Sequence, residues 1–356
     1  MSLTRLQKLQ DALAAQDLAG LIISKAENIR YLSGFTGSTA WLFVLKDKAY
    51  LCTDYRYSQQ AAAETSNWEV VEIKNSNWQQ TIQSLCPSGQ KKIGFESHDL
   101  NYQSWYKLTQ TFSKADLSPT FGLVERLRVQ KDEQELASLR QAIVLADKGA
   151  EYLRSILVPG RTEKEVALEL EFFLRKHGAE RAAFPFIVAS GTRGALPHGT
   201  ASEKKIQAGE LVTVDFGAVY QGYHSDLTRT FVLGKPTDKQ VAIYELVLEA
   251  QEKAIASAGP GVLCVEVDSA ARDVIAGANY GNFFGHATGH GLGLAVHEAP
   301  HVSSRSADTL LPGMVITVEP GVYIPGWGGV RTEDVLLITD QGVEILSRAA
   351  KKPFIL

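Results

Sequence analysis

The C-terminal part of the chain repeats one order of elements twice. In each copy a helix-like segment ends at a Pro-Gly pair, at Pro159-Gly160 and again at Pro260-Gly261, and a second helix and two acidic strand-like segments follow. The first acid lies at nearly the same distance from its proline in both copies, at Asp215 and at Glu319. A recurrence on this scale is typical of a duplicated unit. We therefore predict two related halves, each built from two helices and a strand pair.

Local signals place the helices of these halves. Residues 133–157 carry apolar side chains at close to the helical period. A Thr-x-x-Glu box begins at Thr162 and a Thr-x-x-Gln box at Thr237, and such boxes cap helix N-termini. A fourth helix is expected after Gly261, ending near Gly277.

Residues 1–125 predict a separate α/β unit. An amphipathic helix is expected at residues 1–10 and a buried strand at 21–23. A hairpin of residues 41–45 and 49–53 follows, and then alternating helical and strand-like pieces at 69–73, 92–95 and 102–112. The boundary after residue 125 leaves residues 126–356 as the second domain, which contains the repeated helices and acidic strands.

Two acids emerge from each strand pair. Asp215 ends an apolar run, and Asp226 begins the segment that returns after a turn, so a hairpin would bring the two acids together. Glu319 and Glu333 repeat the arrangement. Any one of these acids, taken alone, would be expected at a strand end facing water. Four together favour a bound cation, because buried carboxylates repel one another unless positive charge or a proton compensates.

One glycine-rich segment supplies histidines. Residues 284–298 place His286, His290 and His297 among four glycines, in a chain that has 8 histidines. Glycine allows close backbone approach, and histidine is the commonest metal ligand. Carboxylates with an imidazole suit Mn²⁺, Co²⁺ or Zn²⁺, and two ions can share bridging acids. The sequence therefore predicts a metal site formed by both halves.

Charge and composition exclude other classes of function. The net charge is -4 at pH 7 without a polybasic stretch, so nucleic acid is not an expected partner. No apolar run approaches the length of a membrane span, so no membrane association is expected. Cys52, Cys86 and Cys264 lie far apart without a CxxC pair. This usage is typical of a reducing compartment, and we expect a cytoplasmic protein.

Five motifs occur in an order that resembles the metal-dependent Xaa-Pro peptidases, prolidase and aminopeptidase P, of the methionine aminopeptidase–creatinase superfamily. They are Val214-Asp215-Phe216-Gly217, Ser225-Asp226-Leu227-Thr228-Arg229-Thr230, Gly289-His290-Gly291-Leu292-Gly293-Leu294, Val318-Glu319-Pro320-Gly321-Val322-Tyr323 and Val330-Arg331-Thr332-Glu333-Asp334. The resemblance is strong over residues 130–356. It implies an α+β fold, in which a creatinase-like N-terminal α/β domain precedes a duplicated pita-bread catalytic domain.

The resemblance also implies ligands for two divalent metal ions, with Mn²⁺ expected first and Co²⁺ or Zn²⁺ as alternatives. Asp226 and Glu333 would bridge the ions, Asp215 would complete one site, and His290 with Glu319 would complete the other. Glu319 would in addition exchange a proton with the attacking water.

Two further histidines match active-site positions of the family. His198 and His297 would contact the scissile carbonyl or the tetrahedral intermediate, although either histidine outside its motif would be expected to be structural. Arg331 would not bind a metal ion itself but would orient the ligand Glu333, or else it would form an ordinary ion pair at the surface.

The resemblance implies hydrolysis of the Xaa-Pro bond at the N-terminus of dipeptides or short peptides. Phe184 is a candidate for the wall of the proline pocket or an ordinary core residue, and His301 stands near where prolidase-like members often place an arginine for the substrate carboxylate. The alternatives are a methionine-type or general metalloaminopeptidase and a non-catalytic peptide-binding module. Members of the family are commonly homodimers, so a homodimer is expected.

Overall fold

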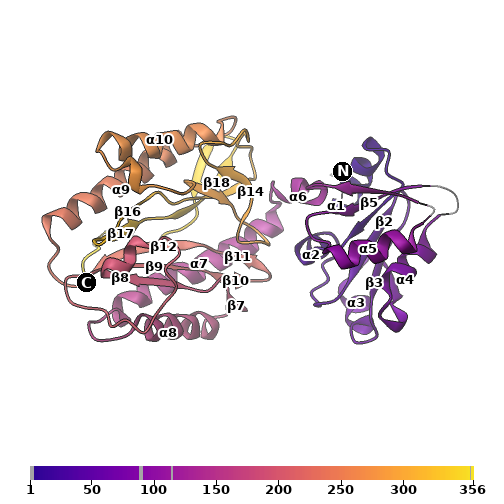
Figure 1. Cartoon of the computed structure of the whole chain (residues 1–356), viewed down its shortest axis with the longest axis horizontal. Coiled ribbons are helices and arrows are strands. Elements are labelled where there is room, and N and C mark those ends of the chain that lie inside the picture. The colour runs from indigo at the N-terminus through magenta and orange to yellow at the C-terminus, as the bar shows by residue number, and fades with distance from the viewer. Residues whose placement is uncertain (1–3, 88–90, 114, 353) are drawn as a thin grey trace. The chain divides into compact units, whose positions relative to one another are not determined.

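The structure, a computed structural model, describes residues 4–87, 91–113, 115–352 and 354–356 (Figure 1). The chain divides into two units, Met1–Arg128 and Val129–Leu356. The first unit contains a six-stranded sheet in the order β4-β3-β2-β1-β5-β6. Its strands are β1 (Gly20–Ile23), β2 (Trp41–Leu45), β3 (Ala49–Thr53), β4 (Glu69–Glu72), β5 (Lys92–Glu96) and β6 (Asp116–Thr120).

Short helices connect these strands. They are α1 (Arg5–Ala15), α2 (Ala26–Ser33), α3 (Ser58–Glu64), η1 (Lys74–Ser76), α4 (Trp78–Leu85), α5 (Tyr102–Thr111) and α6 (Leu123–Arg128). The expected β2–β3 hairpin is confirmed. α1 begins after its cap Thr4, and residues 1–3 of the expected first helix lie outside the described residues. The boundary expected after residue 125 falls inside α6, which packs against α1 and α2 and therefore stays with the first unit.

The first half of the second unit is helix, helix and strand pair, as the repeat predicts. It contains α7 (Glu133–Ile156), α8 (Glu163–Lys176), β7 (Arg181–Ala182), β8 (Ile187–Ser190), η2 (Gly191–Ala195), β9 (Leu211–Phe216), β10 (Ala218–Tyr220), β11 (Tyr223–His224) and β12 (Leu227–Val232). The capping box at Thr162 is confirmed at the start of α8. β9 pairs with β8 on one side and β12 on the other.

The second half repeats this plan with a wider sheet. It contains α9 (Asp238–Ser257), α10 (Cys264–Gly277), η3 (Gly281–Phe283), β13 (Gly289–Gly291), β14 (Glu298–Val302), β15 (Val315–Val318), β16 (Gly321–Ile324), β17 (Gly328–Arg331), β18 (Asp334–Thr339) and β19 (Gly342–Ile345). The strands β14-β13-β15-β18-β19 form one sheet, and β16 pairs with β17. The capping box at Thr237 is confirmed at α9.

Both halves insert a small hairpin between the paired main strands. β10 and β11 interrupt the connection from β9 to β12, and β16 and β17 interrupt the connection from β15 to β18. Figure 1 shows the strands of this unit between α8 on one side and α9 with α10 on the other. Each half has its own buried apolar cluster, so the acids at the inner strand ends lie between two cores.

Candidate metal centre

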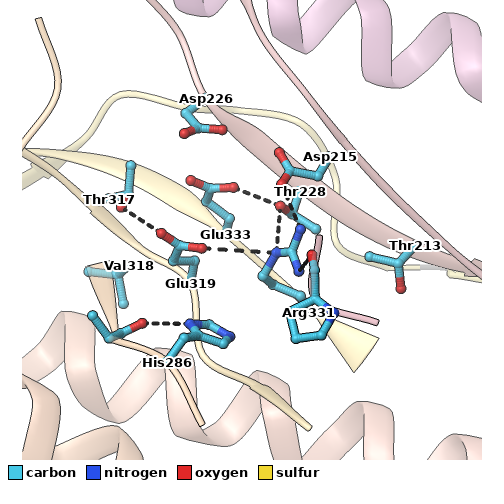
Figure 2. Close-up of polar contacts among 12 residues, drawn as sticks. Thr213, Asp215, Asp226, Thr228, His286, Thr317, Val318, Glu319, Arg331 and Glu333 are labelled. Atoms are coloured by element: carbon cyan, nitrogen blue, oxygen red, sulfur yellow. Dashed lines mark hydrogen bonds and ion pairs between the residues drawn. The ribbon is translucent and has the colours of Figure 1, made fainter. Parts of the chain in front are cut away.

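Five side chains from both halves lie close together, and all of them except Glu333 line one pocket. They are Asp215 in β9, Asp226 just before β12, His290 in β13, Glu319 just after β15 and Glu333 just before β18. One ligand atom each of Asp226, His290 and Glu333 lies within 4.8 Å of the others. Figure 2 shows the four carboxylates gathered around a common space. The adjoining pocket has a volume of about 460 Å³.

His290 lies between two of these acids. Its Nε2 atom is 3.3 Å from Glu319 Oε1 and 3.6 Å from Asp226 Oδ2. Its Nδ1 atom lies 3.0 Å from the carbonyl oxygen of Gly291. A proton on Nδ1 is therefore donated to the backbone, which leaves Nε2 free to bind an ion.

The glycine before His290 is required by the sheet. A Cβ atom at Gly289 would lie 1.9 Å from the carbonyl oxygen of Thr317 in β15. Because real side chains cannot approach backbone so closely, glycine at this position lets β13 lie against β15. The same contact brings Thr317 Oγ1 to 3.1 Å from the His290 amide nitrogen, which donates to it.

Burial makes the ionised acids costly. It raises the pKa of Asp226 well above its usual value, and the charges of Glu333 and Asp215 add to this effect. Burial likewise raises the pKa of Glu333 well above its usual value, with the charge of Glu319 as the next cause. Glu319 differs: burial is again the largest single effect, but the hydrogen bond and charge of His290, with the charges of His286 and Arg331, together outweigh it and bring the pKa of Glu319 to about 2. The site thus concentrates more negative charge than its own residues neutralise.

The unpaired oxygens of the site fit a cation. Among the described residues, Asp215 Oδ1 and Glu333 Oε1 are buried and lack a hydrogen-bond partner. A buried acceptor without a donor is unfavourable, so these atoms need another partner. Four carboxylates and one imidazole are ligands that suit divalent ions such as Mn²⁺ or Zn²⁺. The residues present therefore fit the two ions that the sequence predicts.

Arg331 contacts a different acid from the one expected. Its Nη2 atom donates to Asp215 Oδ2 at 2.6 Å, whereas Glu333 is reached only through Thr228. Arg331 Nε donates to Thr228 Oγ1 at 3.0 Å, and that hydroxyl donates to Glu333 Oε2 at 2.8 Å. The reason is that β17 ends at Arg331 and packs beside β9, while the chain turns into β18 after Glu333. Figure 2 shows both links.

The other predicted site residues line the same pocket. His198, His297, His301 and Phe184 all contribute to its wall. The rings of His290 and His297 meet edge to face, with centroids 4.3 Å apart. Burial, and then the neighbouring charge of His290, lower the pKa of His297, which favours its neutral form.

Family comparison identifies both units. Residues 137–340 match metallopeptidase family M24, and residues 5–130 match the creatinase/prolidase N-terminal domain. The chain belongs to metallopeptidase family M24. This M24 assignment confirms the expected family, the metal-dependent hydrolase class and the two-domain α+β fold.

The similarity to other M24 proteins covers nearly the whole chain. A solved structure of an Xaa-Pro dipeptidase from Bacillus anthracis has a TM-score of 0.96 and 42% identity, covering 99% of this chain and 99% of that one. The Xaa-Pro dipeptidase of Pyrococcus horikoshii is 38% identical, with 98% of each chain covered. An X-Pro aminopeptidase structure from Thermotoga maritima has a TM-score of 0.88 and 37% identity, covering 98% of this chain and 99% of that one.

Several side chains that support the M24 site were not predicted. Thr228 joins Arg331 to Glu333, Thr317 donates to Glu319 Oε1 at 3.2 Å, and Tyr323 accepts from Arg331 Nη1 at 2.8 Å. Thr317 and Glu319 are two residues apart, as are Asp226 and Thr228. The period of two along a strand was therefore the available signal.

None of the helices in the described part of the chain is long and apolar enough to cross a membrane.

Proposed function

We propose that this protein is a dinuclear-metal hydrolase that cleaves the Xaa-Pro bond at the N-terminus of dipeptides or short peptides. The observation that carries the proposal is the convergence of four ligand-type side chains on one pocket, with Glu333 within 4.8 Å of two of them and with two carboxylate oxygens unsatisfied. The names of the relatives, Xaa-Pro dipeptidase and X-Pro aminopeptidase, support the substrate class.

We assign the metal-ligand roles as the resemblance implies. Asp226 and Glu333 would be shared by both ions, Asp215 would complete one site, and His290 with Glu319 would complete the other. Two such ions, when bound, supply Lewis acidity and a water of lowered pKa. Mn²⁺ is the proposed ion, and Co²⁺ or Zn²⁺ would suit the same ligands.

The chain's own groups move the protons and hold the substrate. Glu319 is ionised at neutral pH, because its pKa is about 2, and it would accept the proton of the attacking water. It would pass that proton to the prolyl nitrogen as the bond breaks. His297 would donate a hydrogen bond to the developing oxyanion, and His198 would position the scissile carbonyl from the opposite loop.

The lining of the pocket suits a substrate that has proline next to the scissile bond. Phe184, Pro185 and Ile187 supply an apolar wall to the pocket that contains the acids. A proline ring suits such a wall, and its tertiary amide has no N–H that would need a partner there. His301 lines the same pocket and would bind the substrate carboxylate if the enzyme acts on dipeptides.

The two other candidate functions have less support. A methionine-type aminopeptidase would not need the N-terminal domain that residues 5–130 match. A non-catalytic binding module would not need a complete ligand set. We also propose that the protein is cytoplasmic and forms a homodimer. The three free cysteines support the cytoplasmic location. The dimer is supported by the fact that members of the family are commonly homodimers.

The test is hydrolysis of a matched series of peptides. Ala-Pro, Ala-Pro-Ala and the proline-free Ala-Ala are incubated with the Mn²⁺-loaded protein, with and without excess chelator. Cleavage of Ala-Pro alone, abolished by chelator, would indicate a dipeptidase, and cleavage of Ala-Pro-Ala would indicate an aminopeptidase. Equal cleavage of Ala-Ala, or no cleavage by protein shown to contain metal, would contradict the proposal.

A further inference from the structure

A fully buried carboxylate lies outside the metal centre, at the start of α8. The side chain of Glu163 is 0% exposed. Its Oε1 atom accepts from the backbone N–H and the hydroxyl of Ser190, both at 2.8 Å. Its Oε2 atom accepts from the N–H of Ser202 at 3.1 Å, from the Ser202 hydroxyl at 2.6 Å, and from Arg193. Five donors therefore converge on one carboxylate.

These donors belong to the two ends and the middle of one loop. Ser190 ends β8, Arg193 lies in η2, and Ser202 follows the loop on its return. Arg193 also donates to the carbonyl oxygen of Thr200 at 2.8 Å. Glu163 thus ties both ends of residues 190–202 to the first turn of α8. Buried charge is retained only where such hydrogen bonds offset its lost hydration.

The tip of this loop carries His198 into the pocket. His198 lines the pocket with the acids, and its neighbour Pro197 accepts a hydrogen bond from Arg331 Nη1 at 3.2 Å. A Cβ atom at Gly329 would lie 2.0 Å from the carbonyl oxygen of Gly194. The loop therefore packs directly against the backbone of β17. Lys204 Nζ also donates to Ser190 Oγ at 2.8 Å, but Glu163 is the group that accepts from Ser190, Arg193 and Ser202 together.

We propose that Glu163 is a positioning residue that fixes the loop of residues 190–202 and so holds His198 against the substrate. The inference rests on the proposed function, because His198 is assigned there to the substrate carbonyl. Glu163 does not touch the pocket and is not a ligand. Its effect on turnover passes through the loop, and metal binding at the five acid and histidine ligands does not depend on it.

The variant Glu163→Gln tests this with little change of volume. Oε1 and Oε2 each accept from donors, so the amide nitrogen meets donors whichever way the side chain turns. The matched control is Glu165→Gln, on the same helical turn. Glu165 caps α8 by accepting from the Thr162 N–H at 2.7 Å and does not contact the loop.

We expect Glu163→Gln to lower kcat/KM for the cleaved Xaa-Pro peptide by on the order of 10²-fold, the effect of misplacing a positioned group by about 1 Å. Its metal content should equal that of the wild type, and Glu165→Gln should keep both metal and rate. Glu163→Asp, which retains the charge, should recover part of the loss. Loss of metal in Glu163→Gln, or an unchanged rate, would overturn the proposal.

A double-mutant cycle separates positioning from general stability. If Glu163 acts through His198, then Glu163→Gln combined with His198→Ala should be no slower than His198→Ala alone. Additive losses would show that Glu163 supports the site by another route and would overturn the assignment. Where Glu163→Gln fails to fold, Ser202→Ala takes its place, since it removes one donor and keeps the carboxylate.

Amide hydrogen exchange tests the loop without any substrate. The amides of Ser190 and Ser202 should exchange faster in Glu163→Gln, while those of β13 and β15 should keep wild-type protection. Unchanged exchange at both serines would overturn the proposal. If the wild type cleaves no Xaa-Pro peptide, the proposed function fails, and the exchange result alone decides whether Glu163 holds the loop.

Discussion

At the scale of single residues, the metal centre depends on charge that the chain leaves unbalanced. Asp215 pairs with Arg331, and Glu319 and Asp226 share His290, yet Glu333 has no cation of its own among the described contacts. Arg331 is buried and donates to an acid from the other half of the duplication. The positive charge of the side chains in the site is smaller than the negative charge of its ionised acids, and bound divalent ions would supply the difference.

His290→Ala should remove the ligand nitrogen that lies between Glu319 and Asp226. We expect loss of metal from one site and of nearly all turnover, measured by metal analysis of the purified protein and by peptide hydrolysis. His286→Ala is the control, since His286 Nε2 contacts Tyr323 Oη at 2.8 Å and not a ligand acid. It should retain its metal. A His290→Ala protein with full metal content and full rate would refute the ligand assignment.

At the scale of elements, close strand packing places the ligands. β13 carries His290 and lies between β14 and β15, and its glycines allow the approach. Gly289→Ala should push β13 away from β15 and cost about 1–3 kcal/mol of stability, as overpacking does. It should also weaken metal binding, because His290 follows directly. Both effects are measurable by denaturant unfolding and metal titration.

Gly277→Ala is the matched control for this substitution. Gly277 ends α10, and a Cβ atom there would have no neighbour within 4 Å. Alanine is favoured over glycine in helices by up to about 1 kcal/mol, so this variant should be as stable as the wild type or slightly more so. If both alanine variants lost stability equally, strand crowding would not be the cause.

At the scale of the whole molecule, metal and pH should act together on stability. In chelator-treated protein, the folded-state pKa values of Asp226 and Glu333 lie well above their usual values. The folded chain therefore binds more protons than the unfolded chain, and this contribution is full below about pH 4 and is lost as pH rises through the folded pKa values. The pKa of His290, which Glu319 raises against the effect of burial, acts in the same direction.

We accordingly expect the Tm of chelated protein to fall relative to the metal-loaded protein as pH rises from about 5 to about 8. Added Mn²⁺ should stabilise the fold by about 2.7 kcal/mol at one hundred times its Kd. Metal affinity should increase with pH, because binding displaces protons. Thermal unfolding across this range checks these expectations, and a gap between the two curves that narrows with rising pH would contradict them.

Sequence patterns determined the features that are local or repeated. The capping boxes at Thr162 and Thr237, the β2–β3 hairpin and the repeated order of helices and acids all follow from short-range periods and turns. The order of five motifs was enough to predict the family, because each motif couples a chemically special residue to the glycines or strand residues around it. The residue types of the metal centre could be predicted from the sequence for the same reason.

Only the tertiary structure decided which of these residues meet. Arg331 binds Asp215, 116 residues away, and not its near neighbour Glu333. Glu163 ties the ends of the His198 loop, although at the start of α8 it reads as an ordinary helix-opening acid. Such pairings depend on how two halves with separate cores pack against each other. Their energies come from burial and shared hydrogen bonds between distant segments, which no local pattern encodes.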